Sequence, residues 1–136
     1  MEQLRLSSRR LPAGIVIIVV AGDLDLTVAG RLEAFIRESR RHPGDHLVFD
    51  LAEMTFMDSA GLRVLLNAYT YGRRHGAAVH LAAAQPRPAV VLAITQVGSY
   101  LGVHETVEGA LHAALTGSSP EGDLGIADGG DADATA

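Results

Sequence analysis

Ser59 is the residue best placed for chemistry in this sequence, because it follows Asp58 at the start of a predicted helix. Residues 47–51 alternate as in a strand, whereas apolar residues recur at helical spacing after Ser59. The first turn of a helix offers unpaired N–H groups and the positive end of the macrodipole, and both favour a negative group such as a phosphate. A plain N-cap is the commoner role of an Asp-Ser pair. Because the small residues Ala60 and Gly61 let another surface approach the backbone, we expect the functional site here.

Nucleophilic catalysis is the obvious alternative role for Ser59. The serine hydrolase elbow requires G-x-S-x-G, and Met57 stands where the first glycine is needed, so that only Gly61 fits. His75 and His104 are possible bases, but nothing in the sequence places either beside Ser59. We therefore expect a protein that is not an enzyme and has no catalytic residue.

Carboxylates near the same corner raise the question of a metal site. Asp23, Asp25 and Asp58 follow predicted strands, where carboxylates can bind Mg²⁺, but an isolated D-x-D is more often a loop that caps a helix. The six histidines lack paired ligand spacing, and the absence of lysine rules out a G-x-x-x-x-G-K phosphate loop. The sequence thus predicts no metal and no other cofactor.

The elements that position this corner alternate between strand and helix. An opening hairpin precedes the alternation, which predicts an α/β fold: a small, mainly parallel sheet with an N-terminal antiparallel hairpin and about four helices, packed mainly on one side. Thr27 is a plausible N-cap for the first helix, and Arg40 belongs to its predicted solvent face. Strands are expected at 4–9, 15–21, 46–51, 78–83 and 101–104, and helices at 27–41, 59–75, 86–97 and 106–115. Residues 22–25 are expected to form a polar loop, and residues 52–57 an irregular continuation of a strand.

Composition divides the chain into a domain, residues 1–116, and a tail, residues 117–136. The net charge is −5, yet all of this excess lies in the tail, whose Gly, Ala and Asp content predicts disorder. A neutral domain does not indicate binding to nucleic acid or to an anionic membrane. There is no cysteine, and no targeting or membrane-spanning segment is visible, so we expect a cytoplasmic protein, with a monomer as the expected oligomeric state.

Several motifs together resemble the STAS domain of bacterial anti-anti-sigma factors, which are antagonists of anti-sigma factors. The likeness covers about residues 4–115 in the right order and spacing, and M-D-S followed by a small residue and G-L is its most specific part. The matching segments are G-D-L-D at 22–25, L-V-F-D-L at 47–51, F-M-D-S-A-G-L at 56–62 and G-A-A-V-H-L at 76–81.

The resemblance implies a switch. In that family, the serine after the Asp is phosphorylated by an anti-sigma factor with serine kinase activity, and a PP2C-type phosphatase reverses the modification. The unphosphorylated form binds the anti-sigma factor and frees its sigma factor. By resemblance, Ser59 is the phosphoacceptor, and its surroundings form part of the partner surface. That surface comprises Asp23, Asp25, Thr27, Asp58, Ala60, Gly61, Leu62 and Arg63.

Two positions depart from the family pattern. Many members have a second hydroxyl where Ala60 stands, and a small Gly is common at the position of Arg63. A second hypothesis therefore stays open: a STAS-like module that binds a small ligand or lipid as a sensor and is not regulated by phosphorylation.

Overall fold

Six strands form the sheet of the computed structural model, which describes residues 2–117. The first two strands pair antiparallel as a hairpin, and every other pairing is parallel, as the alternation of elements predicts. The main path runs β1-β2-β3-β5-β6, with β4 paired to the far end of β2. The strands are β1 (Arg5–Leu11), β2 (Ile15–Leu24), β3 (His46–Asp50), β4 (Met54–Met57), β5 (Val79–Ala82) and β6 (Gly102–His104).

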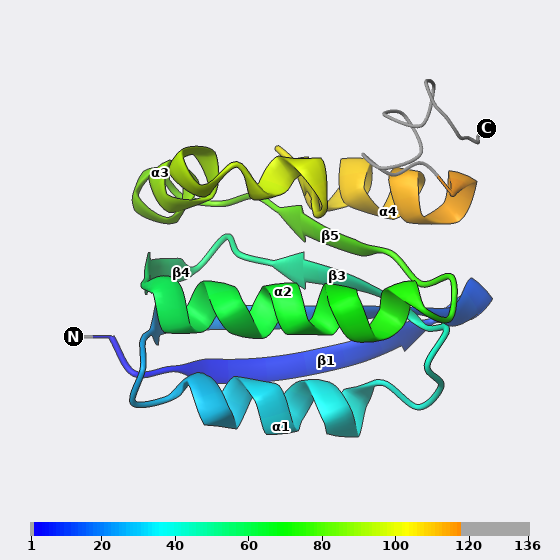
Figure 1. The fold of residues 1–136 in the computed structure, drawn as a ribbon, viewed down its shortest axis with the longest axis horizontal. Helices are drawn as coiled ribbons and strands as arrows, with labels where there is room; N and C mark the ends of the chain where they lie inside the picture. The colour runs from blue at the N-terminus through cyan, green and yellow to red at the C-terminus, as the bar shows by residue number, and fades with distance from the viewer. Residues whose placement is uncertain (1, 118–136) are drawn as a thin grey trace.

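The four α-helices do not share one side of the sheet, which corrects the expectation of a mainly one-sided packing. Helices α1 (Ala29–Ser39) and α2 (Ser59–Arg73) lie side by side over one face (Figure 1). Helix α4 (Val107–Thr116) packs on β3, β5 and β6, and its alanines meet a second apolar cluster. Helix α3 (Pro86–Thr95) contacts β4 and is followed by a short 3-10 turn, Val97–Ser99. A central strand such as β2 is therefore buried on both faces, as its unbroken apolar run predicts.

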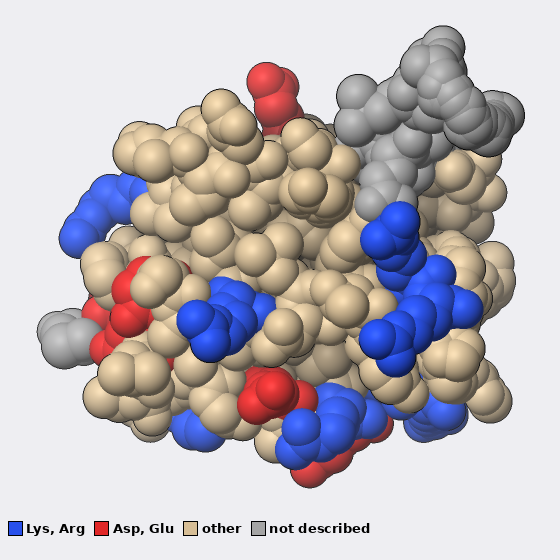
Figure 2. Space-filling model, in the orientation of Figure 1, with Lys and Arg blue, Asp and Glu red and all other residues tan. Residues whose placement is uncertain are grey.

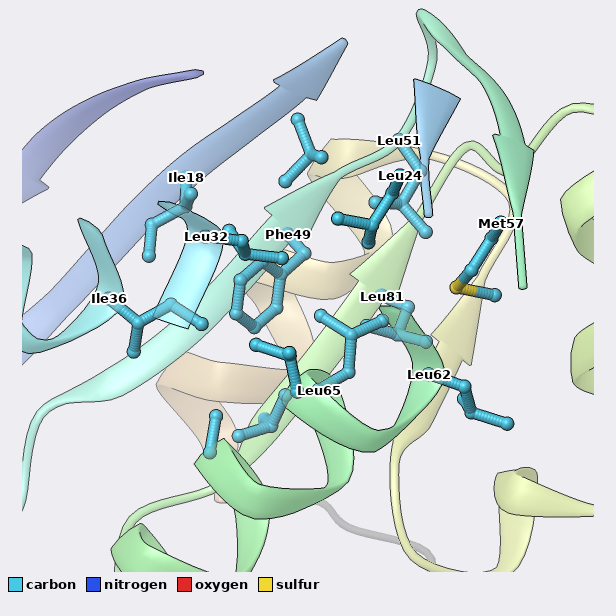
Figure 3. Close-up of a cluster of buried hydrophobic side chains, with 14 of the residues drawn as sticks. Ile18, Leu24, Leu32, Ile36, Phe49, Leu51, Met57, Leu62, Leu65 and Leu81 are labelled. Atoms are coloured by element: carbon cyan, nitrogen blue, oxygen red, sulfur yellow. The ribbon is translucent and has the colours of Figure 1, made fainter. Parts of the chain in front are cut away.

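The main core is aliphatic around one aromatic ring and holds α2 against the sheet. Phe49 of β3 is fully buried, with Leu32 of α1 and Leu65 of α2 in the same cluster (Figure 3). Full burial of each such side chain contributes about 1.5–3 kcal/mol to folding. Packing against the sheet therefore fixes the position of α2, and with it the place of its first residue, Ser59.

The largest departure from the predicted elements lies at the carboxyl end of β2. Residues 22–24 were expected in a loop, but they extend β2 and pair with β4. Gly22 permits this because its φ is +88° and an added Cβ would collide with the backbone carbonyl of Gln3. Residues 54–57 accordingly form a separate strand rather than an irregular end of β3. The result is a second small parallel pair directly beneath the Asp58-Ser59 corner.

A buried histidine and a half-buried one lie together under α4. His80 of β5 is 1% exposed, and its Nδ1 is 3.0 Å from Nε2 of His104 in β6. Burial, with lesser contributions from His104 and His46, lowers the pKa of His80 to about 4. His80 is therefore neutral in the folded protein at neutral pH.

The predicted cap of the last helix is confirmed, whereas the predicted tail falls outside the described residues. The Thr106 hydroxyl accepts a hydrogen bond from the Gly109 N–H at 3.0 Å, as an N-cap does. Residues 118–136 are not described, so the domain boundary at residue 116 and the disorder of the tail stay predictions.

Candidate functional site

Asp58 joins the two segments that form the candidate site. Its Oδ1 accepts from the Gly61 N–H at 3.0 Å, which caps α2. Its Oδ2 accepts from the Leu26 N–H, also at 3.0 Å, and Leu26 lies in the connection between β2 and α1. Asp58 is thus more than an N-cap: one carboxylate fixes the start of α2 to the connection that follows β2.

Gly61 lets the start of α2 lie directly on the end of β2. An added Cβ would be 2.7 Å from Leu24 Cγ, 2.8 Å from its Cδ2 and 3.0 Å from its carbonyl oxygen. Real Cβ atoms essentially never show contacts under 3.0 Å, so either the helix or Leu24 must shift when a larger residue replaces Gly61. The Asp58 N–H also donates to the Leu24 carbonyl at 3.2 Å, which shows how closely the two backbones approach.

The other two aspartates each accept hydrogen bonds from groups of their own. Asp25 Oδ1 accepts from the Thr27 hydroxyl at 2.6 Å and from the Thr27 N–H at 3.0 Å, and the hydroxyl bond is the main cause of the lowered pKa of Asp25. The prediction that Thr27 caps α1 is therefore wrong: α1 begins at Ala29 with Val28 at its N-cap, because Thr27 donates back to Asp25.

Asp23 ties the N-terminal segment to β4. Its Oδ1 accepts from the Thr55 hydroxyl at 2.5 Å, and its Oδ2 accepts from the Glu2 N–H at 3.2 Å. Each of the three carboxylates is thus engaged with its own neighbours. Within residues 2–117, no group of three or more His, Cys, Asp or Glu side chains is arranged to hold a metal ion.

Ser59 is exposed at the first position of α2. No described residue makes a hydrogen bond with its hydroxyl, and none accepts from the N–H groups of Ser59 and Ala60. Asp58 therefore takes one of the free donors of the first turn but leaves two of them available. Arg63, one turn further along α2, is exposed and can lie on the same side of the helix.

The predicted surroundings of Ser59 divide into surface and support. Ala60 is half-buried, whereas Gly61 and Leu62 are buried, and Leu62 belongs to the main core with 6% exposure. Gly61 and Leu62 thus shape the corner from below, and a partner that approaches Ser59 contacts its exposed neighbours.

Leu26 is a surface residue of the site that the sequence did not reveal. It is 75% exposed, although it is a large apolar residue, and its backbone is bonded to Asp58. A single exposed leucine is common on protein surfaces, but the backbone bond to Asp58 keeps this one beside the Asp58-Ser59 corner, where an approaching partner can contact it. The only available signal was its place between Asp25 and Thr27, where no apolar stripe of a helix had yet begun.

Charge is unevenly distributed along α2. Acidic side chains gather at the end of the molecule where α2 begins, with basic side chains beside them, and further arginines gather where α2 ends (Figure 2). The acidic end includes Asp23, Asp25 and Asp58, and the last turn of α2 carries Arg73, followed by Arg74. The candidate site is therefore a corner with three carboxylates, the exposed Ser59 hydroxyl and the exposed Leu26. In the described part of the chain, no helix is long and apolar enough to cross a membrane.

Comparison with known proteins places this geometry in a family. Residues 9–110 match the STAS domain. An anti-sigma factor antagonist from Mycobacterium paratuberculosis has a similar structure, with a TM-score of 0.70 and 24% identity over 83% of this chain and 95% of that one. Phosphorylated SpoIIAA from Bacillus gives a TM-score of 0.60 and 18% identity, over 79% and 97% of the two chains. The STAS domain of a SulP transporter from Vibrio cholerae gives 0.56 and 25%, over 79% and 85%.

Proposed function

The chain belongs to the STAS domain family, and from this premise we propose that it is an anti-sigma factor antagonist. In this proposal, the unphosphorylated protein binds an anti-sigma factor that is also a serine kinase, and its sigma factor is released. Phosphorylation of Ser59 ends the binding, and a PP2C-type phosphatase restores it. The chain acts as a binding module and not as an enzyme.

The observation that carries the proposal is the exposed Ser59 hydroxyl at the open N-terminus of α2, beside Asp58. A kinase can reach this hydroxyl without unfolding any element. A phosphate adds about −1.5 to −2 charges at pH 7. The two unpaired N–H groups of the first turn can donate hydrogen bonds to the phosphate oxygens, so the folded protein tolerates the added group.

The same phosphate is unfavourable in a complex. Asp58 holds the exposed Leu26 next to the corner, so a partner that covers Leu26 also removes water from the neighbouring carboxylates. An added phosphate would then be buried close to like charge, which is strongly unfavourable at an interface. Phosphorylation is therefore expected to abolish the complex and leave the fold intact.

The test compares binding and phosphorylation in a set of serine variants. Wild-type protein, Ser59→Ala and Ser59→Asp are each mixed with the anti-sigma kinases of the same host, and Ser99→Asp, at another exposed serine, is the matched control. We expect wild type, Ser59→Ala and Ser99→Asp to bind, and Ser59→Asp to bind about 30-fold or more weakly. After incubation with ATP, intact mass and fragmentation should locate one phosphate on Ser59, and none on Ser59→Ala.

Two results would count against the proposal in different ways. If Ser59→Asp binds as well as Ser99→Asp, the charge mechanism is wrong. If no cognate kinase binds or modifies the wild-type protein, the second hypothesis gains, namely a ligand-binding sensor module. That hypothesis has one specific support, the likeness to the STAS domain of a transporter at 25% identity.

A further inference from the structure

A groove separates α1 from α2 at the end of the molecule opposite the approach to Ser59. Its volume is about 510 Å³, within the usual range for small-molecule sites. Ile36 and Val64 are apolar residues of its lining, and Arg37, Arg40 and Arg74 contribute positive charge. The groove thus combines an apolar lining with three cationic side chains.

Arg40 is the unusual member of this lining. It was predicted on the solvent face of α1, but it is only 9% exposed, because its side chain turns toward α2. Its Nη1 donates to the Ala68 carbonyl at 3.2 Å, and its guanidinium carbon lies 5.3 Å from the centre of the Tyr71 ring. Its Nε and Nη2 are buried without a hydrogen-bond partner in the described structure.

The charge of Arg40 is only partly compensated, because Asp45 acts on it from beyond ion-pair distance. Among the described residues, no carboxylate lies within ion-pair distance of Arg37, Arg40 or Arg74. Glu33 is the single acidic residue in the lining, so the groove carries an excess of positive charge. A buried charge without a counterion is unfavourable, and an anion in the groove would remove much of that cost.

We propose that this groove binds a small organic anion, a phosphate or carboxylate group on a planar apolar body. The anionic group pairs with Arg37 and Arg74 at the rim and lies in the field of buried Arg40, which is weakly screened because it is covered. The body lies along Ile36, Val64 and the half-exposed ring of Tyr71. This assignment does not depend on Ser59 or on the proposed function.

The test uses three probes that separate charge from shape. Phenyl phosphate carries both features of the ligand class, inorganic phosphate carries only the charge, and phenol carries only the ring. Each is titrated into the full chain, and binding is followed by the amide shifts in ¹H–¹⁵N spectra. We expect saturable shifts with phenyl phosphate along the second halves of α1 and α2, binding of inorganic phosphate about tenfold weaker, and no saturable shift with phenol.

Two variants and a control assign the contacts. Arg74→Gln is exposed and should fold, and it should weaken phenyl phosphate binding about tenfold, as loss of a charge-assisted hydrogen bond does. Arg40→Gln should weaken it similarly, and Arg9→Gln, an equal charge change on β1 away from the groove, should not. The proposal is overturned if Arg9→Gln and Arg74→Gln have equal effects, if inorganic phosphate binds as tightly as phenyl phosphate, or if phenyl phosphate produces no saturable shifts in α1 and α2.

Discussion

Replacement of Gly61 by alanine tests whether the start of α2 must lie directly on β2. Alanine is the better helix former by about 1 kcal/mol, so a helix glycine with free space around it should gain stability from this change. At Gly61, however, the new Cβ would be 2.7 Å from Leu24 Cγ and 3.0 Å from the Leu24 carbonyl oxygen. Such overpacking typically costs about 1–3 kcal/mol. We therefore expect Gly61→Ala to lose up to about 2 kcal/mol of unfolding free energy once the helix gain is included.

Gly30 supplies the matched control. It is also a helix glycine, in α1, but an added Cβ there would meet nothing within 4 Å. Gly30→Ala should therefore stabilise the protein by about 0.5–1 kcal/mol, so the two identical substitutions should have opposite signs.

Urea unfolding at constant pH measures both variants against wild type. The midpoint should fall for Gly61→Ala and rise for Gly30→Ala at a similar m-value. Gly61→Ala should also weaken binding to the proposed partner, because displacement of the helix start shifts Ser59 relative to Leu26. If both variants were stabilised equally, the close approach of α2 to Leu24 would not exist in solution.

Two further predictions concern buried and capping groups. The pKa of His80 is about 4 in the folded protein and near 6.5 in the unfolded chain, so between these pH values only the unfolded state takes up the proton. The free energy of unfolding should therefore fall by up to about 3 kcal/mol as the pH drops from 6.5 to 4. Urea midpoints across this pH range should show the loss, and His80→Leu should remove most of the slope; an unchanged slope would assign it to other groups. Asp58→Ala removes the acceptor for the N–H groups of Gly61 and Leu26, and the free energy of unfolding should fall by about 1–2 kcal/mol in the same urea assay. An unchanged free energy of unfolding would mean that water replaces both bonds.

The order of elements and the place of Ser59 were predictable because they depend on local patterns. Alternating apolar residues, helical spacing and an Asp-Ser pair at a helix start are all visible within a few neighbouring positions. The extension of β2 to Leu24 was not predictable, because it depends on pairing with β4, a contact between segments far apart in the sequence. Gly22 gave the only local signal, and a glycine after a strand reads equally well as the start of a loop.

Side chains that act across elements were the other source of error. An N-cap was the alternative role of the Asp-Ser pair, and Asp58 does cap α2, but its further bond to the Leu26 N–H needs the connection after β2 to fold back over α2. Arg40 falls on the polar stripe of α1 by its spacing, yet its long side chain reaches α2 and is buried there. Thr27 is a good N-cap by residue type, but its hydroxyl donates a hydrogen bond to Asp25, which lies two residues earlier.

The separation of charge along α2 has a kinetic consequence. The start of α2 lies near Asp23, Asp25 and Asp58, whereas its end carries Arg73 and is followed by Arg74. This uneven charge orients an approaching charged partner before contact. A phosphate on Ser59 would add negative charge at the start of α2. It would therefore change the orientation in which encounters occur. Modification would then alter the association rate as well as the lifetime of a complex, and the rate effect alone should fade as ionic strength rises.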